Sequence, residues 1–108
     1  MTIFELLSSQ EIDVNRASRY ANPMHWIQFS ITIKFSLPDY KQNEDYRESS
    51  RVLFDAIQNS GSRTNAIEWA KHFMVKAIAY GIQTKNLDWR TKFIAAYEIY
   101  TSLSKGEY

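Results

Sequence analysis

The second half of the chain places its apolar residues at helical spacing. Residues 62–81 divide into an apolar half of a helical wheel and an opposite half of charged and small residues. The apolar half comprises Ala66, Ile67, Trp69, Ala70, Phe73, Met74, Ala77 and Ile78, and the other half comprises Glu68, Lys71, His72, Val75, Lys76 and Ala79. This pattern predicts a helix from about Ser62 that Gly81 ends, with Trp69 packed in the core.

Capping residues predict a helix on either side of this one. Asn43 is a good N-cap, and the acidic pair at 44–45 suits the positive end of a helix dipole, so a helix is expected from there to Gly61. Asn86 is the expected cap of a last helix, and Gly106 lies just past its end.

The first forty residues carry further helix signals. Residues 2–5 and 8–11 each match a capping box, and the second predicts a helix that runs to about residue 20. Asn22 and Pro23 predict another start, because Asn is a good N-cap and Pro is favoured at the first helical position. That helix must stop before Pro38.

Residues 27–37 are compatible with two structures. Apolar and polar residues alternate there, which is typical of a strand. A strand must pair its backbone, however, and no other segment offers a comparable partner. A helix that is apolar all round, and therefore buried at the centre of the fold, has a similar composition. The alternative is a strand that pairs across a dimer or with another subunit.

Composition favours a helical fold with one core. The 108 residues are 44% apolar and 15% aromatic, with three Gly and two Pro, which leaves few turn residues. We expect residues 1–108 to form a single all-α domain, a bundle of four to five helices, with a strand at 27–37 as the minor alternative. Cysteine is absent, and the sequence shows neither a secretory signal nor an apolar run of about 20 residues, so we expect a cytoplasmic protein without membrane contact.

Catalytic and metal-binding patterns are missing from the sequence. Neither His25 nor His72 has a metal-ligand partner one turn away, and the three glycines are isolated, so no phosphate-binding loop is present. The serines lie at helix starts, in loops or near the chain end. We therefore predict no enzyme activity, no metal, no cofactor and no small-molecule substrate.

Basic residues gather in the C-terminal part of the chain. Residues 61–108 hold seven basic and four acidic residues, whereas the whole chain carries a formal charge of +1. Lysine and arginine spaced along a helical bundle can follow a phosphate backbone without reading bases. The predicted nucleic-acid-binding residues are Arg63, Lys71, Lys76, Lys85, Arg90 and Lys92.

The chain resembles the small subunits of CRISPR–Cas effector complexes. It is most similar to the C-terminal helical segment of the type I-D large subunit, which is also made as a separate protein. The resemblance lies in the length, the lack of cysteine, the basic residues over an aromatic-rich core, and the segments 65–71 (NAIEWAK) and 93–97 (FIAAY).

The resemblance implies a non-catalytic role in a crRNA-guided, Cascade-like antiviral defence complex. Its partners would be other effector subunits, further copies of this chain, and the backbones of crRNA and target nucleic acid.

Two other functions stay open from the sequence. A helix ending at Gly61 and another opening at Arg63 loosely match a helix-turn-helix DNA-binding regulator, and a phage-type anti-defence or adaptor protein has no feature that excludes it.

Overall fold

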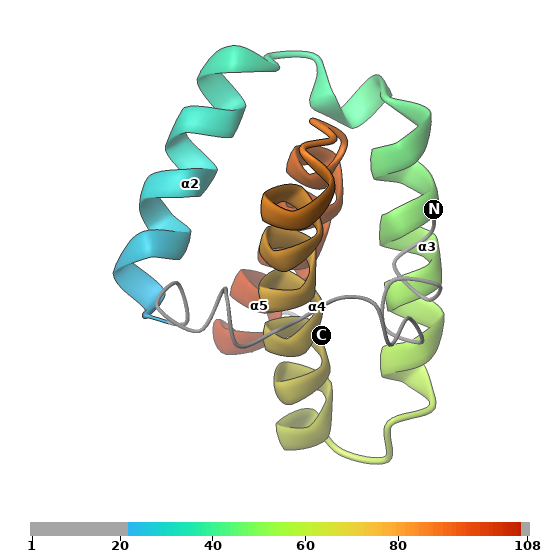
Figure 1. The fold of residues 1–108 in the computed structure, drawn as a ribbon. Coiled ribbons are helices and arrows are strands. Elements are labelled where there is room, and N and C mark those ends of the chain that lie inside the picture. The colour runs from blue at the N-terminus through green and yellow to red at the C-terminus, as the bar shows by residue number, and fades with distance from the viewer. Residues whose placement is uncertain (1–21, 107–108) are drawn as a thin grey trace.

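The computed structural model describes residues 22–106, and these residues form a helical bundle. Within this part of the chain the elements are α2 (Pro23–Ser36), η2 (Tyr40–Gln42), α3 (Glu44–Gln58), α4 (Arg63–Thr84) and α5 (Trp89–Ser104). The predicted all-α fold is confirmed (Figure 1). The helix predicted over residues 8–20 lies outside the described residues.

Three helices begin at the caps that the sequence predicts. The Oδ1 of Asn22 accepts a hydrogen bond from the Met24 amide at 2.9 Å, and Pro23 occupies the first helical position of α2. Asn43 caps α3 in the same way, accepting from the Asp45 amide at 2.8 Å. Ser62 caps α4. Each cap satisfies amides that the first turn of a helix leaves without a partner.

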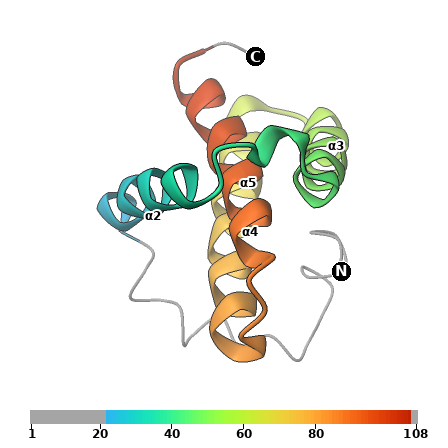
Figure 2. The ribbon, with the colours of Figure 1, turned by 90° about the horizontal axis from the view of Figure 1, so that it is seen from above.

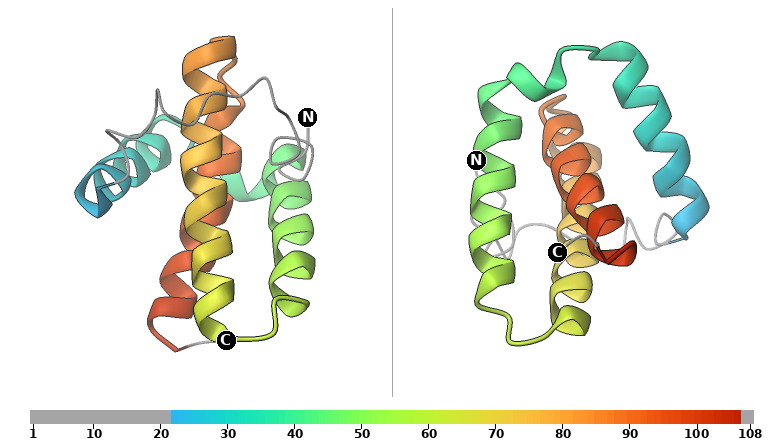
Figure 3. Two further views of the ribbon diagram at one scale, coloured as in Figure 1. Left: turned by 60° about the horizontal axis from the view of Figure 1, so that its bottom comes forward. Right: turned by 180° about the vertical axis from the view of Figure 1, so that it is seen from behind.

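Helices α4 and α5 run antiparallel at the centre of the bundle, between α2 on one side and α3 on the other (Figures 1 and 2). The two views of Figure 3 show α4 and α5 side by side over most of their length. Their facing residues make most of the core, to which α3 adds Leu53 and α2 adds Trp26 and Ile33. No helix in the described part of the chain is both long enough and apolar enough to cross a membrane.

Gly81 does not end α4, contrary to the prediction; the helix continues to Thr84. The glycine instead allows α5 to approach, because a Cβ at this position would lie 2.5 Å from Cγ of Trp89. Lys85 ends the helix in the left-handed conformation (φ 56°), and its amide donates to the Gly81 carbonyl at 3.0 Å. The last helix also begins three residues later than Asn86, at Trp89.

Residues 27–36 belong to helix α2, so the helical prediction is confirmed and the strand is not observed. The prediction that this helix is buried at the centre is wrong, because α4 holds that position. Every residue of α4 from Phe73 to Tyr80 is buried except Val75, which is partly exposed. In α2, by contrast, only Trp26, Ser30 and Ile33 are buried. The alternating sequence of α2 spreads apolar side chains around its whole circumference, and α5 covers only one side of it.

Candidate binding cleft

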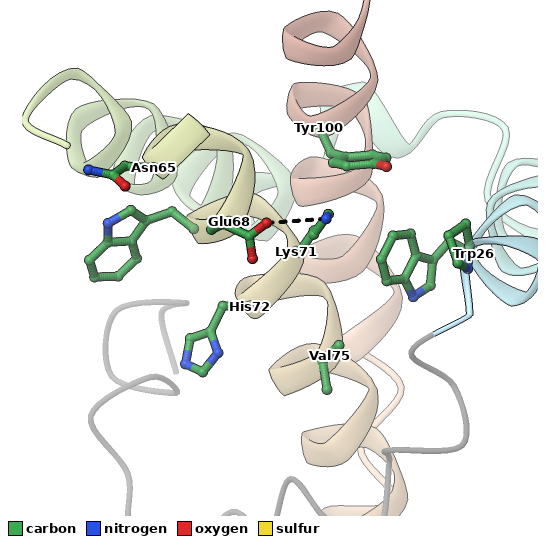
Figure 4. Close-up of a pocket in the computed structure, with 9 residues that line it drawn as sticks. Trp26, Asn65, Glu68, Lys71, His72, Val75 and Tyr100 are labelled. Carbon is green, nitrogen blue, oxygen red and sulfur yellow. Dashed lines mark hydrogen bonds and ion pairs between the residues drawn. The ribbon is translucent and has the colours of Figure 1, made fainter. Parts of the chain in front are cut away.

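An open cleft of about 730 Å³ runs over the N-terminal half of α4. Helix α2 contributes Pro23 and Trp26 to its lining, and α5 contributes Tyr100. The remaining lining residues all come from α4: Asn65, Glu68, Trp69, Lys71, His72 and Val75. The cleft is therefore built where three helices meet, and most of its lining residues belong to α4 (Figure 4).

Aromatic rings supply most of the apolar wall. Trp26 packs edge-on against Tyr100, with ring centroids 5.5 Å apart, and is almost fully buried. Trp69 lies 5.8 Å from Phe73 but keeps 40% of its surface exposed. The prediction that Trp69 is a core residue is thus wrong. Its ring packs on the core through one face and leaves indole surface open to the cleft.

Polar groups of α4 line the same cleft. Lys71 Nζ lies 3.2 Å from Glu68 Oε1, one turn earlier on the helix, and both side chains reach solvent (Figure 4). His72 is exposed on the cleft side, yet partial burial of its ring, followed by the positive charge of Lys76, lowers the pKa of His72 below its usual value of 6.5. His72 is therefore mainly neutral at pH 7 and adds a hydrogen-bonding ring rather than a charge.

Two of the six predicted nucleic-acid-binding residues are not on the surface. Lys92 is fully buried, and its Nζ lies 2.7 Å from Asp45 Oδ1 and 3.4 Å from Asp88 Oδ2. Lys76 is 9% exposed. The buried ammonium group of Lys92 cannot reach a phosphate unless the bundle opens, and Lys76 offers little side-chain surface for such a contact.

The other four residues do not form one patch. Arg63 and Lys71 lie in the first half of α4, whereas Lys85 follows its last turn and Arg90 begins α5. Because a helix rises 1.5 Å per residue, Lys85 lies about 20 Å along the helix axis from Lys71 and about 30 Å from Arg63. Arg90 is partly used within the fold, since its Nε donates to the Leu87 carbonyl at 3.1 Å.

The exposure of Trp69 to the cleft was not predicted from the sequence, because a helical wheel does not show where neighbouring helices end. Trp69 shares the apolar half of α4 with residues that are fully buried, such as Phe73, but the cleft opens at its level of the bundle. The signal that could have indicated this role is an aromatic residue close in sequence to two basic residues. Arg63, Trp69 and Lys71 fall within nine residues, or about 12 Å of helix axis.

No protein-family model, curated protein or solved structure matches this chain. Among residues 22–106, no three His, Asp or Glu side chains come together in a way that could hold a metal ion.

Proposed function

We propose that this chain is a non-catalytic subunit that holds single-stranded nucleic acid within a larger complex, as the small subunit of a CRISPR–Cas effector does. The observation that carries the proposal is Trp69. Its indole is 40% exposed in an open cleft, on the same stretch of α4 as Arg63 and Lys71.

An exposed aromatic ring beside basic residues is the usual platform for a single strand. Bases stack on the ring with little regard to sequence, which contributes about 1–3 kcal/mol per base, and basic side chains contact the phosphates. In this chain Arg63 begins α4 at the surface, and Trp69 and Lys71 both line the cleft, although side chains two residues apart project to different sides of a helix. Glu68 neutralises part of the charge of Lys71, which keeps the expected affinity of one copy low.

Weak binding by each copy is compatible with this role. The chain carries a formal charge of +1, and the buried Lys76 and Lys92 leave fewer cations for phosphates than the sequence suggests. In an assembly, neighbouring copies on one strand act together, so that a few contacts per copy add up to a stable complex. Such binding is expected to weaken steeply as salt concentration rises.

The position of α4 weighs against a helix-turn-helix regulator. A recognition helix must lie free enough to enter the major groove. Here α4 is packed into the core from Phe73 to Tyr80, and its exposed residues lie mainly in its first turns and at its last turn. Binding that prefers one duplex sequence over random duplex and over single strands would favour the regulator nonetheless.

The direct test measures binding of a fluorescently labelled single-stranded RNA and DNA by anisotropy at low salt. Replacing Trp69→Ala removes the stacking surface and is expected to weaken binding about 5- to 100-fold. Ile82→Ala is the matched control, because Ile82 is a similarly exposed apolar residue (37%) near the other end of α4. Equal affinities for wild type and Trp69→Ala would refute the proposed role of the cleft.

Charge contacts are tested separately through the dependence of binding on salt. The double variant Arg63→Gln/Lys71→Gln is expected to lower the salt slope by about one per lost phosphate contact. Lys41→Gln/Arg51→Gln, on η2 and α3, removes the same charge away from the cleft and is expected to leave the slope largely unchanged. The CRISPR part of the proposal has its own test in gene order, since a reading frame that starts inside a large-subunit gene would support it and a neighbourhood without such genes would oppose it.

A further inference from the structure

Helix α2 presents a continuous apolar stripe to solvent. Met24, Ile27, Ile31 and Phe35 are 75%, 51%, 65% and 89% exposed. Their spacing of three, four and four residues places them on one face of the helix. Of the seven large apolar side chains that are exposed in the described part of the chain, these four share one face of α2. This concentration, rather than any single exposed residue, sets the stripe apart.

The stripe lies on the side of α2 that faces away from the bundle. The opposite side packs inward through Trp26 and Ile33, which are 3% and 2% exposed. Helix α2 itself forms one outer edge of the molecule, with nothing from residues 22–106 beyond it (Figures 1 and 2). A second macromolecule can therefore approach the stripe without displacing any described element.

The low charge of α2 indicates which kind of partner surface can bind the stripe. The helix contains one charged residue, Lys34, whose Nζ lies 3.8 Å from Glu98 Oε1 on α5. The other polar residues of the exposed side are uncharged, and the Thr32 hydroxyl donates to the carbonyl of Gln28 at 3.0 Å. With a single partly exposed lysine that is paired with Glu98, such a face offers little charge to attract nucleic acid or a charged peptide, and it matches a partner surface that is also largely apolar.

A second copy of α2 provides such a surface with matching spacing. In an antiparallel pair, residues whose numbers add to 58 or 59 lie opposite each other. Met24 then faces Phe35 of the second copy, and Ile27 faces Ile31, so a flexible side chain meets the large ring and the two isoleucines meet at the centre. Antiparallel packing also sets opposite ends of the helix dipoles side by side.

The area of the stripe reaches the lower limit for a specific pair. Exposed apolar side chains of this size each offer on the order of 100–200 Å², so burying four from each copy removes about 1,000 Å² from water. That is about the lower limit for a specific interface between proteins. A two-fold pair uses the same patch on both copies, so no further surface is needed.

We propose that the outer stripe of α2 is a homodimer interface, in which two copies of this chain pair antiparallel through Met24, Ile27, Ile31 and Phe35. The interface uses the side of α2 opposite Trp26, so it leaves the cleft open. The inference is therefore independent of the proposed nucleic-acid function, and either can fail without the other.

The test is the mass of the full 108-residue chain in solution, measured by sedimentation equilibrium over a wide range of protein concentration. Wild type is expected to form a dimer, and Ile27→Glu/Ile31→Glu is expected to be monomeric with an unchanged helical circular dichroism spectrum. Leu87→Glu is the control, because Leu87 is as exposed (63%) but lies between α4 and α5. A monomeric wild type overturns the proposal, as does a dimer that survives the double substitution.

Cysteine pairing tests the direction of the helices and does not depend on the glutamate variants folding. The chain has no cysteine of its own, so introduced thiols report only on the designed contact. A mixture of Met24→Cys and Phe35→Cys chains is expected to form a disulfide-linked heterodimer under mild oxidation, and each variant alone is expected to crosslink much less. Preferential crosslinking of each variant with itself would indicate a parallel pair and overturn the proposed arrangement.

Discussion

Lys92 of α5 and Asp45 of α3 form an ion pair with 2.7 Å between Nζ and Oδ1, and the lysine side chain is fully buried. Asp88 lies 3.4 Å from the same ammonium group, and the Thr91 hydroxyl bonds to Asp45. The ring of Tyr80 lies 5.7 Å away as a further contact for the cation. A residue that charge patterning assigns to nucleic acid thus fixes α3 against α5.

Removing one partner of this pair is expected to destabilise the bundle strongly. Asp45→Ala leaves a buried ammonium group with only Asp88, at a cost of about 3 kcal/mol. Lys92→Met is expected to cost less, because Asp45 keeps about a quarter of its side chain exposed and can be hydrated. Urea unfolding of both single variants and the double variant measures the coupling. Equal, small losses for both single variants would contradict a buried, interacting pair.

Features of the fold that depend on neighbouring residues in the sequence could be predicted, whereas features that depend on distant residues could not. The caps at Asn22, Asn43 and Ser62 were predictable because an N-cap bonds to amides two or three residues away. The burial of Lys92 was not predictable from its own helix. It depends on Asp45, which lies 47 residues earlier in the chain, and no pattern within α5 indicates this contact.

Helix α2 and Trp69 illustrate the same limit. The composition of α2 is that of a buried helix, but burial depends on how many neighbours surround a helix, and in the described structure α5 is the helix that α2 contacts most. Trp69 lies on the apolar half of α4 but beside an open cleft. For both, the sequence indicates which residues are apolar, and only the packing of the helices decides which of them meet solvent.

Gly81 provides a prediction in which two physical effects have opposite signs. Helix propensity alone favours Gly81→Ala by about 1 kcal/mol, since Gly81 lies inside α4. The new methyl group would clash with Trp89, however, so we expect a net loss of about 1–3 kcal/mol. Chemical denaturation gives the sign directly. In a Trp89→Leu background, Gly81→Ala should lower the free energy of unfolding by less than it does beside tryptophan. If Gly81→Ala alone stabilises the protein, the close packing against Trp89 is contradicted.

The two tyrosines that bind Glu98 predict a loss of stability at alkaline pH. The hydroxyl groups of Tyr40 and Tyr46 both donate to the Glu98 carboxylate, and the Tyr46 bond is 2.6 Å long. Burial, with the bond to Glu98 and its charge, raises the pKa of Tyr40 from 10.0 to about 12 and also raises that of Tyr46. Unfolded tyrosine loses its proton near pH 10, so the stabilisation is complete below pH 10 and is lost as the pH rises toward 12.

The free energy of unfolding, measured in urea from neutral pH to about pH 11.5, should therefore fall steeply above pH 10. Tyr40→Phe/Tyr46→Phe is expected to be less stable at neutral pH but to lose less stability over that range. If the double variant and wild type lose stability in parallel, other groups control the alkaline transition.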